Sequence, residues 1–368
     1  MPEMDFARDP RLMIMAGGLS TVAIALQLWF RPTYAAEKGS AASLQSRKRS
    51  LVTGTLVMVV FLIVTSGLYA LSHDVLVYRR TQFPDYPRLS ELSIAFIAFA
   101  LLTIGRIIAM PIFQFLGRVM TGGKATEQQQ QRFSAQLWKT LYHSGATLAP
   151  LIILRRGASW WPPGIGSPEE MFENYPFVPV DAPLNVYYLV QLGWSLHSLL
   201  VTLLQAGRGG YLTMITHHMA TQMLVFGSYF IQNNLRLGTE VFFVHDICDV
   251  PVCISRMLLD IGYAKVASMF YILLMITWAL FRLVLFPFSV IRNVSFSSFT
   301  HGWIKWEDAY GWIPLTLGLF ILVILHIRWF IELWDIGARY FRSGIAKDTT
   351  EHSLSESHAQ PSSSQHED

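Results

Sequence analysis

The stretch "HHMATQMLVFGSYFIQNNLRLGTEVFFVHDICD", from His217 to Asp249, decides how the chain folds. Its apolar residues belong to two closely spaced runs, 211–233 and 239–260, each long enough for the roughly 20 residues that a helix needs to cross a bilayer. The stretch also contains three histidines, two aspartates, a glutamate and an arginine. Charged groups at bilayer depth cost several kcal/mol, so they usually face a protein interior and serve a function.

The whole composition agrees with a membrane protein. The chain has 368 residues, of which 52% are hydrophobic and 14% charged, whereas soluble domains carry about 25% charged residues. The net charge of +3 is too small to indicate a nucleic-acid partner. The only cysteines, Cys248 and Cys253, would lie on roughly opposite sides of a helix, so we expect no disulfide between them.

Nine apolar segments predict an all-α polytopic membrane protein. They are long and closely spaced, which favours helices over the strands of a membrane barrel. We expect the first to be retained, because residues 1–11 lack the basic start of a signal peptide. The predicted spans are 12–30, 51–72, 92–117, 137–154, 185–206, 211–233, 239–260, 268–290 and 312–334.

Loop charges predict the orientation of these spans. Basic residues gather in the segments 31–50 and 118–136 and after the last span, which places these three segments together on the cytosolic side. The loop 155–184 is mainly acidic and rich in Pro and Trp, so we expect a folded loop on the opposite side. Residues 336–368 become rich in serine and acidic groups and predict a disordered cytosolic tail.

The polar groups of the opening stretch have spacings that suit catalysis. His217 precedes Thr221 by one helical turn, and His218 precedes Gln222, so each ring has an expected hydrogen-bond partner. The second helix carries a histidine and two carboxylates on one face: His245, Asp246 and Asp249. A carboxylate can hold an imidazole in one tautomer and stabilise its cation, which predicts a base with its orienting group.

Other interpretations compete with catalysis. A di-iron site would need about eight histidines in spaced boxes, and a zinc site built from His and Asp ligands remains a minority alternative. A proton relay in a transporter is weakened by the absence of an inverted sequence repeat. We predict that the isolated histidines form hydrogen bonds between helices: His143, His197 and His326. We predict no bound metal.

The segment resembles the signature of ceramide synthases, members of the TLC-domain family. Their pattern runs roughly HHxxTxxLxxxSY, then Asn, then RxGxxxxxxHDxxD. The matching residues here are His217, His218, Thr221, Leu224, Ser228, Tyr229, Asn233 or Asn234, Arg236, Gly238, His245, Asp246 and Asp249. "RFSAQLWKTLYHS", "FRLVLFPF" and "LHIRWF" resemble flanking spans, so the resemblance covers about residues 92–335. Cys253 and Arg256 stand where the family often has an acidic residue and a lysine.

The resemblance implies a TLC-type helical barrel of about six to seven spans at 92–335, preceded by an N-terminal region, 1–91, with two further spans. It implies acyl-CoA-dependent N-acylation of a sphingoid base, sphinganine or sphingosine, to (dihydro)ceramide in the endoplasmic reticulum membrane, with a cytosolic C-terminus. Long-chain or very-long-chain acyl-CoA is then a co-substrate, no cofactor is expected, and membrane lipids surround the chain. Homo- and hetero-oligomers both stay open.

A histidine near neutral pKa suits removal of a proton from the amine, or attack on the thioester as a nucleophile. The expected catalytic residues are His217, His218, His245, Asp246 and Asp249. The expected substrate-binding residues are Trp138, Arg208, Thr221, Ser228, Tyr229 and Lys265, with Arg208 and Lys265 facing CoA phosphates. We place Arg236 and Glu240 in a luminal turn between the two helices. The alternative is a TLC protein that binds or moves lipids, or assists translocation, without catalysis.

Overall fold

A computed structural model describes residues 41–83, 86–179, 181–205, 210–297, 302 and 309–343. The predicted span at 12–30 and Arg208 lie outside these ranges. Every regular element within them is helical, which confirms the predicted all-α class. The elements are α2 (Ala41–Leu71), α3 (His73–Gln82), η2 (Leu89–Glu91), α4 (Leu92–Met120), α5 (Glu127–Ile153), α6 (Pro168–Met171), α7 (Ala182–Leu203), α8 (Tyr211–Phe226), η3 (Gly227–Ile231), α9 (Leu235–Asp260), α10 (Ala264–Thr277), η4 (Trp278–Ile291), η5 (Asn293–Ser297) and α12 (Ala309–Ser343).

Eight of the nine predicted spans therefore coincide with helices, and the remaining span, 12–30, lies outside the described residues. Four helical stretches in the described residues are long and apolar enough to cross a membrane: Leu89–Met120, Ala182–Leu203, Ala264–Ser295 and Leu315–Tyr340. The helices α5, α8 and α9 are shorter or more polar, and they carry the predicted site. α12 continues to Ser343, so the predicted tail boundary at residue 335 falls too early.

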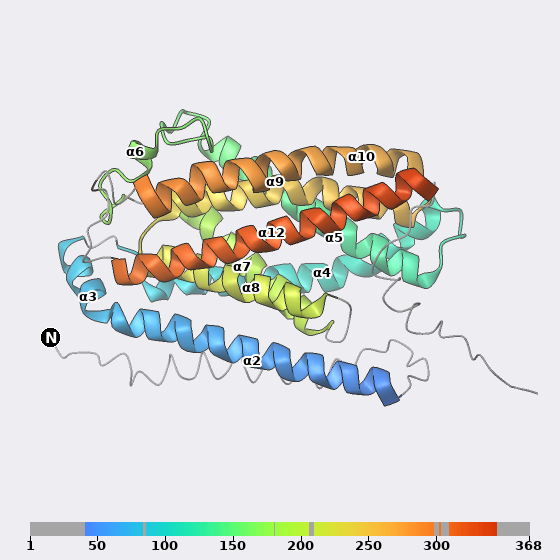
Figure 1. Ribbon diagram of the computed structural model, residues 1–368, viewed down its shortest axis with the longest axis horizontal. Helices are drawn as coiled ribbons and strands as arrows, with labels where there is room; N and C mark the ends of the chain where they lie inside the picture. Colours follow the sequence, from blue (N-terminus) through green and yellow to red (C-terminus); the bar gives the residue numbers. More distant parts are fainter. Residues whose placement is uncertain are drawn as a thin grey trace, which may run out of the picture.

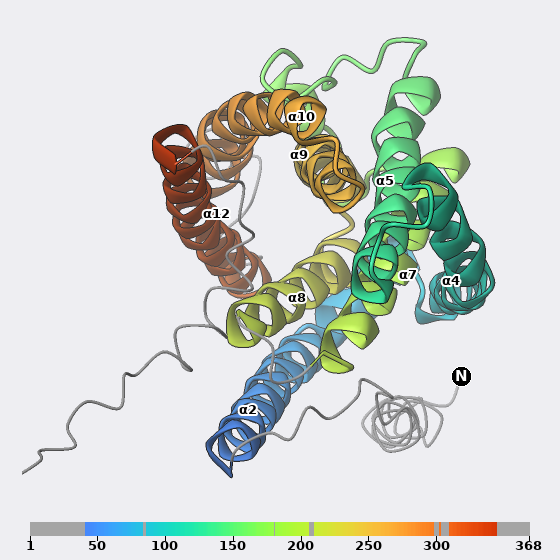
Figure 2. The same ribbon diagram turned by 90° about the vertical axis from the view of Figure 1, so that its right-hand side faces the viewer.

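The helices follow one another around a ring, as the end-on view in Figure 2 shows. α8 contacts α12, α12 contacts η4, and α10 and η4 pack on α9. From α9 the ring continues through α5, α4 and α7 back to α8. α2 lies outside the ring against α8 (Figure 1). This arrangement is a helical barrel with an added N-terminal helix.

The two ends of the barrel differ in charge. Figure 1 places the start of α2, the turn between α4 and α5 and the end of α12 at the same end, as the basic segments predict. An ion pair of 2.8 Å between Arg132 and Asp260 ties α5 to α9 there. At the other end lies the loop with α6, where Arg236 Nη1 donates to the Glu170 carbonyl at 2.5 Å.

Local sequence sets the helix boundaries that place the site. Thr126 caps α5 and exchanges hydrogen bonds with Gln129, so two orphan donors at the helix start are satisfied. Asn234 caps α9 through its side-chain oxygen. η4 is π-helical and contains Pro287, whose missing N–H cannot serve a regular ladder. Widened π turns of this kind are frequent at functional sites.

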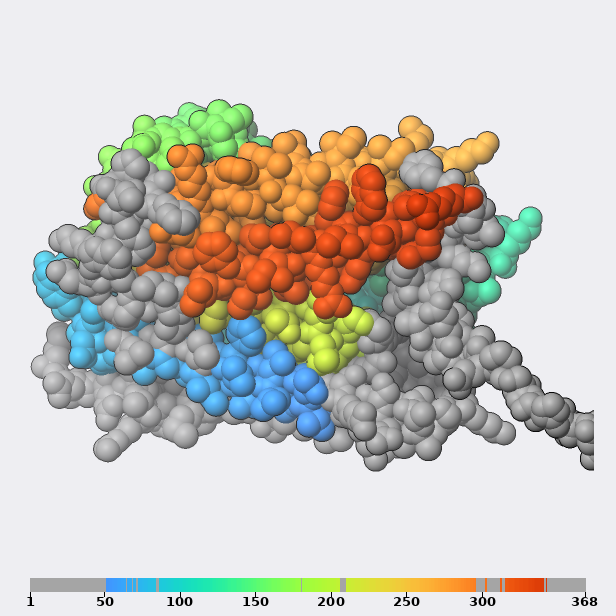
Figure 3. Space-filling view, in the orientation of Figure 1, coloured from blue at the N-terminus to red at the C-terminus, as the bar shows by residue number. Residues whose placement is uncertain are grey.

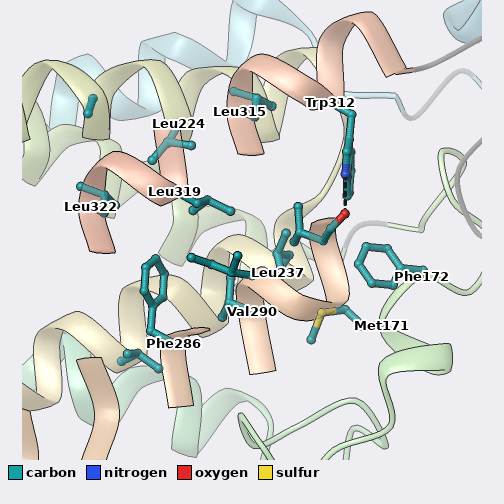
Figure 4. Close-up of a cluster of buried hydrophobic side chains, with 14 of the residues drawn as sticks. Met171, Phe172, Leu224, Leu237, Phe286, Val290, Trp312, Leu315, Leu319 and Leu322 are labelled. Atoms are coloured by element: carbon teal, nitrogen blue, oxygen red, sulfur yellow. Dashed lines mark hydrogen bonds between the residues drawn. The ribbon is translucent and has the colours of Figure 1, made fainter. Parts of the chain in front are cut away.

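A buried apolar cluster fills the space between α8, α9, η4 and α12 toward the α6 end (Figure 4). Trp312 donates its indole N–H to the Val294 carbonyl at 2.9 Å, which fixes the start of α12 against η5. The space-filling view shows α12 crossing this face, with α10 on one side and α8 and α2 on the other (Figure 3). α12 therefore closes the wall over the cluster.

Candidate active site

The two adjacent histidines of α8 have ring nitrogens without hydrogen-bond partners among the described residues. The ring centroid of His217 lies 5.4 Å from that of His218 and 5.2 Å from the Trp329 ring on α12. Within the described residues, no hydrogen bond to either imidazole is formed, and Nδ1 of His217 is buried without a partner. These nitrogens are therefore free to act on a substrate.

His245 on α9 is engaged at both ring nitrogens. Its Nδ1 lies 2.6 Å from the Val241 carbonyl, and its Nε2 lies 3.0 Å from Nε2 of His326 on α12. A carbonyl only accepts, so Nδ1 of His245 carries the proton. In the neutral ring, Nε2 then accepts a hydrogen bond from Nε2–H of His326. His245 is therefore occupied in this state, whereas the ring nitrogens of His217 and His218 are free.

This chain of hydrogen bonds predicts that His326 matters for stability. His326 is fully buried, and its replacement by methionine would leave Nε2 of His245 without a donor. We expect His326→Met to lower the free energy of unfolding by about 1–3 kcal/mol, the usual cost of an unsatisfied buried group. His326→Gln keeps an N–H donor and should lose less. Thermal unfolding in detergent measures both, and equal melting temperatures for the two variants would contradict the assignment.

Asp249 forms an ion pair with an arginine that crosses from η4. Arg282 Nη2 donates to Asp249 Oδ1 at 2.7 Å and to the His245 carbonyl at 2.9 Å. The guanidinium lies 4.1 Å from the ring centroid of Trp278, so an aromatic face also stabilises its charge. Arg282 is buried. A buried cation therefore balances one carboxylate of the predicted pair.

Asp246 pairs with His143 on α5 rather than with a histidine of α8. The distance from His143 Nδ1 to Asp246 Oδ1 is 2.7 Å. The other carboxylate oxygen accepts a hydrogen bond of 2.5 Å from Gln191 Nε2 on α7. Tyr142 donates to Gln191 Oε1 at 2.7 Å and thereby fixes which end of the amide faces Asp246. The predicted pairing of an α8 histidine with this carboxylate is not formed, and α5 supplies the histidine instead.

Lys139 adds a second cation to the cluster. It lies one turn before His143 on α5 and interacts electrostatically with Asp249 and Cys253 on α9 and with His218 on α8. Lys139 is exposed, and the protein groups that surround it belong to the ring helices. The cluster therefore combines free imidazoles with two carboxylates and two cations.

The expected orienting groups of the α8 histidines bond elsewhere. Thr221 donates to the backbone carbonyl of His217 at 2.9 Å rather than to its ring. Gln222 donates to Ser195 on α7 at 2.6 Å rather than to His218. Both side chains consequently hold α8 in place, and the two imidazoles stay free.

Among the other expected binding residues that the structure describes, Ser228 and Tyr229 form their hydrogen bonds with groups other than the α8 histidines. The Ser228 hydroxyl lies 2.5 Å from that of Tyr188, and Tyr229 donates to Glu91 and to Asn185. These bonds lie around η3, toward the α6 end. Lys265 is exposed in the first turn of α10.

The Trp138 ring packs near Gly105 of α4, and its centroid lies 6.4 Å from that of the His197 ring on α7. His197 in turn bonds Thr103 across the helix pair at 3.0 Å, as expected of a lone membrane histidine. His143 and His326 also make bonds between helices, but their partners, Asp246 and His245, belong to the cluster. The first interpretation of these two histidines was therefore incomplete.

Arg282 is the residue that sequence reasoning missed, although a signal was present. An arginine inside the apolar run 268–290 is costly at bilayer depth, which marks it as a functional candidate. Gln191 offered no comparable signal. A glutamine in an amphipathic stretch gives no indication that its amide hydrogen-bonds to a carboxylate.

Glu240 does not lie in the turn between α8 and α9, contrary to expectation. That turn is made by residues 232–234, while Glu240 is buried in the second turn of α9. Arg236 does lie at the α6 end, as predicted. A pocket of about 200 Å³ opens there beside Trp160 and Asn233, and none of the predicted site residues lines it.

Two sets of known proteins resemble the chain. The family model of the TLC domain matches residues 132–335, which is more than half of the 368 residues, and starts later than the expected 92. Ceramide synthase hyl-1 of Caenorhabditis elegans is 26% identical over 62% of this chain and 63% of its own length. Ceramide synthase hyl-2 of the same organism is 25% identical over 78% and 92%. Sphingosine N-acyltransferase lag1 of Schizosaccharomyces pombe is 27% identical over 67% and 63%.

The match thus spans less than two-thirds of the length of hyl-1 and lag1, and most of hyl-2. The matched family region contains the whole polar cluster, from Lys139 on α5 to Trp329 on α12. The paired histidines of α8 and the HDxxD stretch of α9 accordingly fall within the matched region, and the chain belongs to the TLC-domain family.

Proposed function

We propose that the protein transfers an acyl group from acyl-CoA to the amine of a sphingoid base, forming (dihydro)ceramide. The observation that carries this proposal is the pair of α8 imidazoles without hydrogen-bond partners, beside a cluster of carboxylates and cations. The printed names of the relatives, ceramide synthase and sphingosine N-acyltransferase, support the same reaction.

The chemistry needs a group that accepts a proton as the amine attacks the thioester carbonyl. A free imidazole can do this, or can attack first and carry the acyl group. Because both nitrogens of His245 are engaged, His217 and His218 are the proposed base or nucleophile. Asp246 and Asp249 balance charge through His143 and Arg282. No metal or cofactor is required for this route.

The surroundings suit two lipid substrates. Phe286 contacts His245 and His326, with ring centroids 5.3 Å away in both cases, and also belongs to the apolar cluster of Figure 4. The polar cluster thus borders apolar side chains directly, as acyl chains require. We propose that the barrel lies in the endoplasmic reticulum membrane with its basic end toward the cytosol, and that the CoA moiety enters at this end.

Purified protein incubated with sphinganine and a series of acyl-CoA chain lengths should yield N-acyl product, detected by lipid mass spectrometry. The distribution of products gives the chain-length preference directly. A folded protein that forms no N-acyl product at any chain length would contradict the proposal. It would favour a TLC protein that binds or moves lipids without catalysis.

A further inference from the structure

The ion pair between α5 and α9 has the geometry of a general base with its orienting carboxylate. An ionised carboxylate only accepts hydrogen bonds, so the 2.7 Å contact with Asp246 places the proton of His143 on Nδ1. The lone pair of the neutral ring is then on Nε2. In the described residues, Nε2 of His143 has no hydrogen-bond partner and is not one of the buried unpaired atoms, and 11% of the His143 side chain is exposed.

Asp246 is held more firmly than a simple helix-to-helix contact needs. Its second oxygen accepts from Gln191 Nε2 at 2.5 Å, and the same amide nitrogen donates to the Tyr187 hydroxyl at 3.0 Å. The Tyr142 hydroxyl fixes the opposite end of that amide. Three helices, α5, α7 and α9, therefore position this one carboxylate.

Aromatic side chains also fix the orientation of the His143 ring. Its ring meets the Trp194 ring edge-on with centroids 5.3 Å apart, and Tyr142 stacks on Trp194 at 3.6 Å. Rotation of the His143 ring away from Asp246 would break these contacts. A ring fixed in one tautomer and one orientation is what a general base needs.

The dyad faces the same groups as the α8 histidines. His143 shares a face of α5 with Lys139, which interacts electrostatically with His218. Asp249, one turn after Asp246, interacts with both His143 and His218. His143 and the free imidazoles of α8 thus approach one region of the barrel from opposite helices.

We infer that His143 and Asp246 form the base dyad that takes the proton from the attacking amine, an inference that rests on the proposed function. The uncharged amine attacks the acyl carbonyl carbon, the new C–N bond forms, and the amine proton passes to Nε2 of His143. Asp246 stabilises the resulting imidazolium. The bond to the leaving group breaks, its electron pair leaves with that group, and His143 returns the proton to it. The leaving group is an α8 imidazole that has first taken the acyl group from acyl-CoA. In that earlier step its ring nitrogen attacks the thioester carbonyl, the C–S bond breaks, and CoA leaves as the thiol with the imidazole proton.

The test compares His143→Gln, Asp246→Asn and the double variant with the wild type, using sphinganine and acyl-CoA at saturating concentrations. We expect each single variant to lower kcat by about 10²–10⁴-fold with little change in KM, which is the usual contribution of a general base. The double variant should be no slower than the slower single variant, because the two residues act as one unit. Radiolabel transfer from acyl-CoA to the protein without sphinganine should persist.

His197→Asn is the matched control, since His197 is also a buried histidine bonded across helices but only to Thr103. It should keep kcat within about threefold. Melting temperatures in detergent identify any variant that fails to fold, and Asp246→Asn, which keeps the side-chain volume, then reports on the dyad. If the wild type formed no N-acyl product, the proposed function itself would be contradicted. If the wild type is active and folded His143→Gln keeps kcat within about threefold of the wild-type value, the dyad alone is overturned. It is also overturned if the losses of the two single variants add up in the double variant.

Discussion

His217→Gln and His218→Gln are each expected to lower kcat/KM for N-acylation at least about 100-fold. The ring nitrogens of both residues have no hydrogen-bond partner in the described part of the chain. Their loss therefore breaks no hydrogen bond within the described part of the protein. A general base contributes about 10²–10⁴-fold, and removal of a nucleophile costs more. Glutamine approximates the shape of histidine but cannot accept and return a proton at neutral pH.

Stability separates this loss from a folding defect. Because neither ring is hydrogen-bonded, both variants should melt within a few degrees of the wild type. His326→Met, which removes a buried donor, should melt lower. The two histidines can then be divided by incubation with labelled acyl-CoA alone. The variant that no longer takes up label has lost the nucleophile. Full activity in both folded variants would contradict an α8 site.

The fold followed from the sequence because hydropathy and helix length are local properties. A bilayer permits few solutions for long apolar segments, so 92–117 and 312–334 could be read as helices directly. The positions of basic segments fixed which ends lie together. What sequence could not give was the order of helices around the ring, since this depends on packing between segments far apart in the chain.

Local spacing also sets how much of the candidate cluster could be predicted from the sequence. Adjacent residues such as His217 and His218, or Asp246 and Asp249, share a helix, so their spacing alone brings them near one another. The pairs on which the proposed chemistry depends join residues 103 and 81 positions apart, His143 with Asp246 and His245 with His326. A single sequence holds no record of such contacts. Thr221 and Gln222 show the converse, because correct helical spacing did not stop them from bonding to other partners.

Arg282→Leu is expected to produce the largest loss of stability. It removes the cation that pairs with Asp249 at 2.7 Å and the donor to the His245 carbonyl. A buried charge left without its partner costs about 3–5 kcal/mol in the free energy of unfolding. The Asp249 side chain is 31% exposed, which reduces this cost, so we expect a loss near about 3 kcal/mol. Denaturation in mixed detergent and urea measures it.

The loss should depend on the charge of Asp249 rather than on the volume of the arginine. Adding Asp249→Asn to Arg282→Leu removes the unpaired carboxylate, so the double variant should recover a large part of the stability that Arg282→Leu loses. N-acylation should not recover with it, because Asp249 is also the group that interacts with His143 and His245. If the double variant were less stable than Arg282→Leu by the full effect of Asp249→Asn, the two side chains would be energetically independent. Packing of the guanidinium on Trp278, rather than its charge, would then explain why Arg282 is buried.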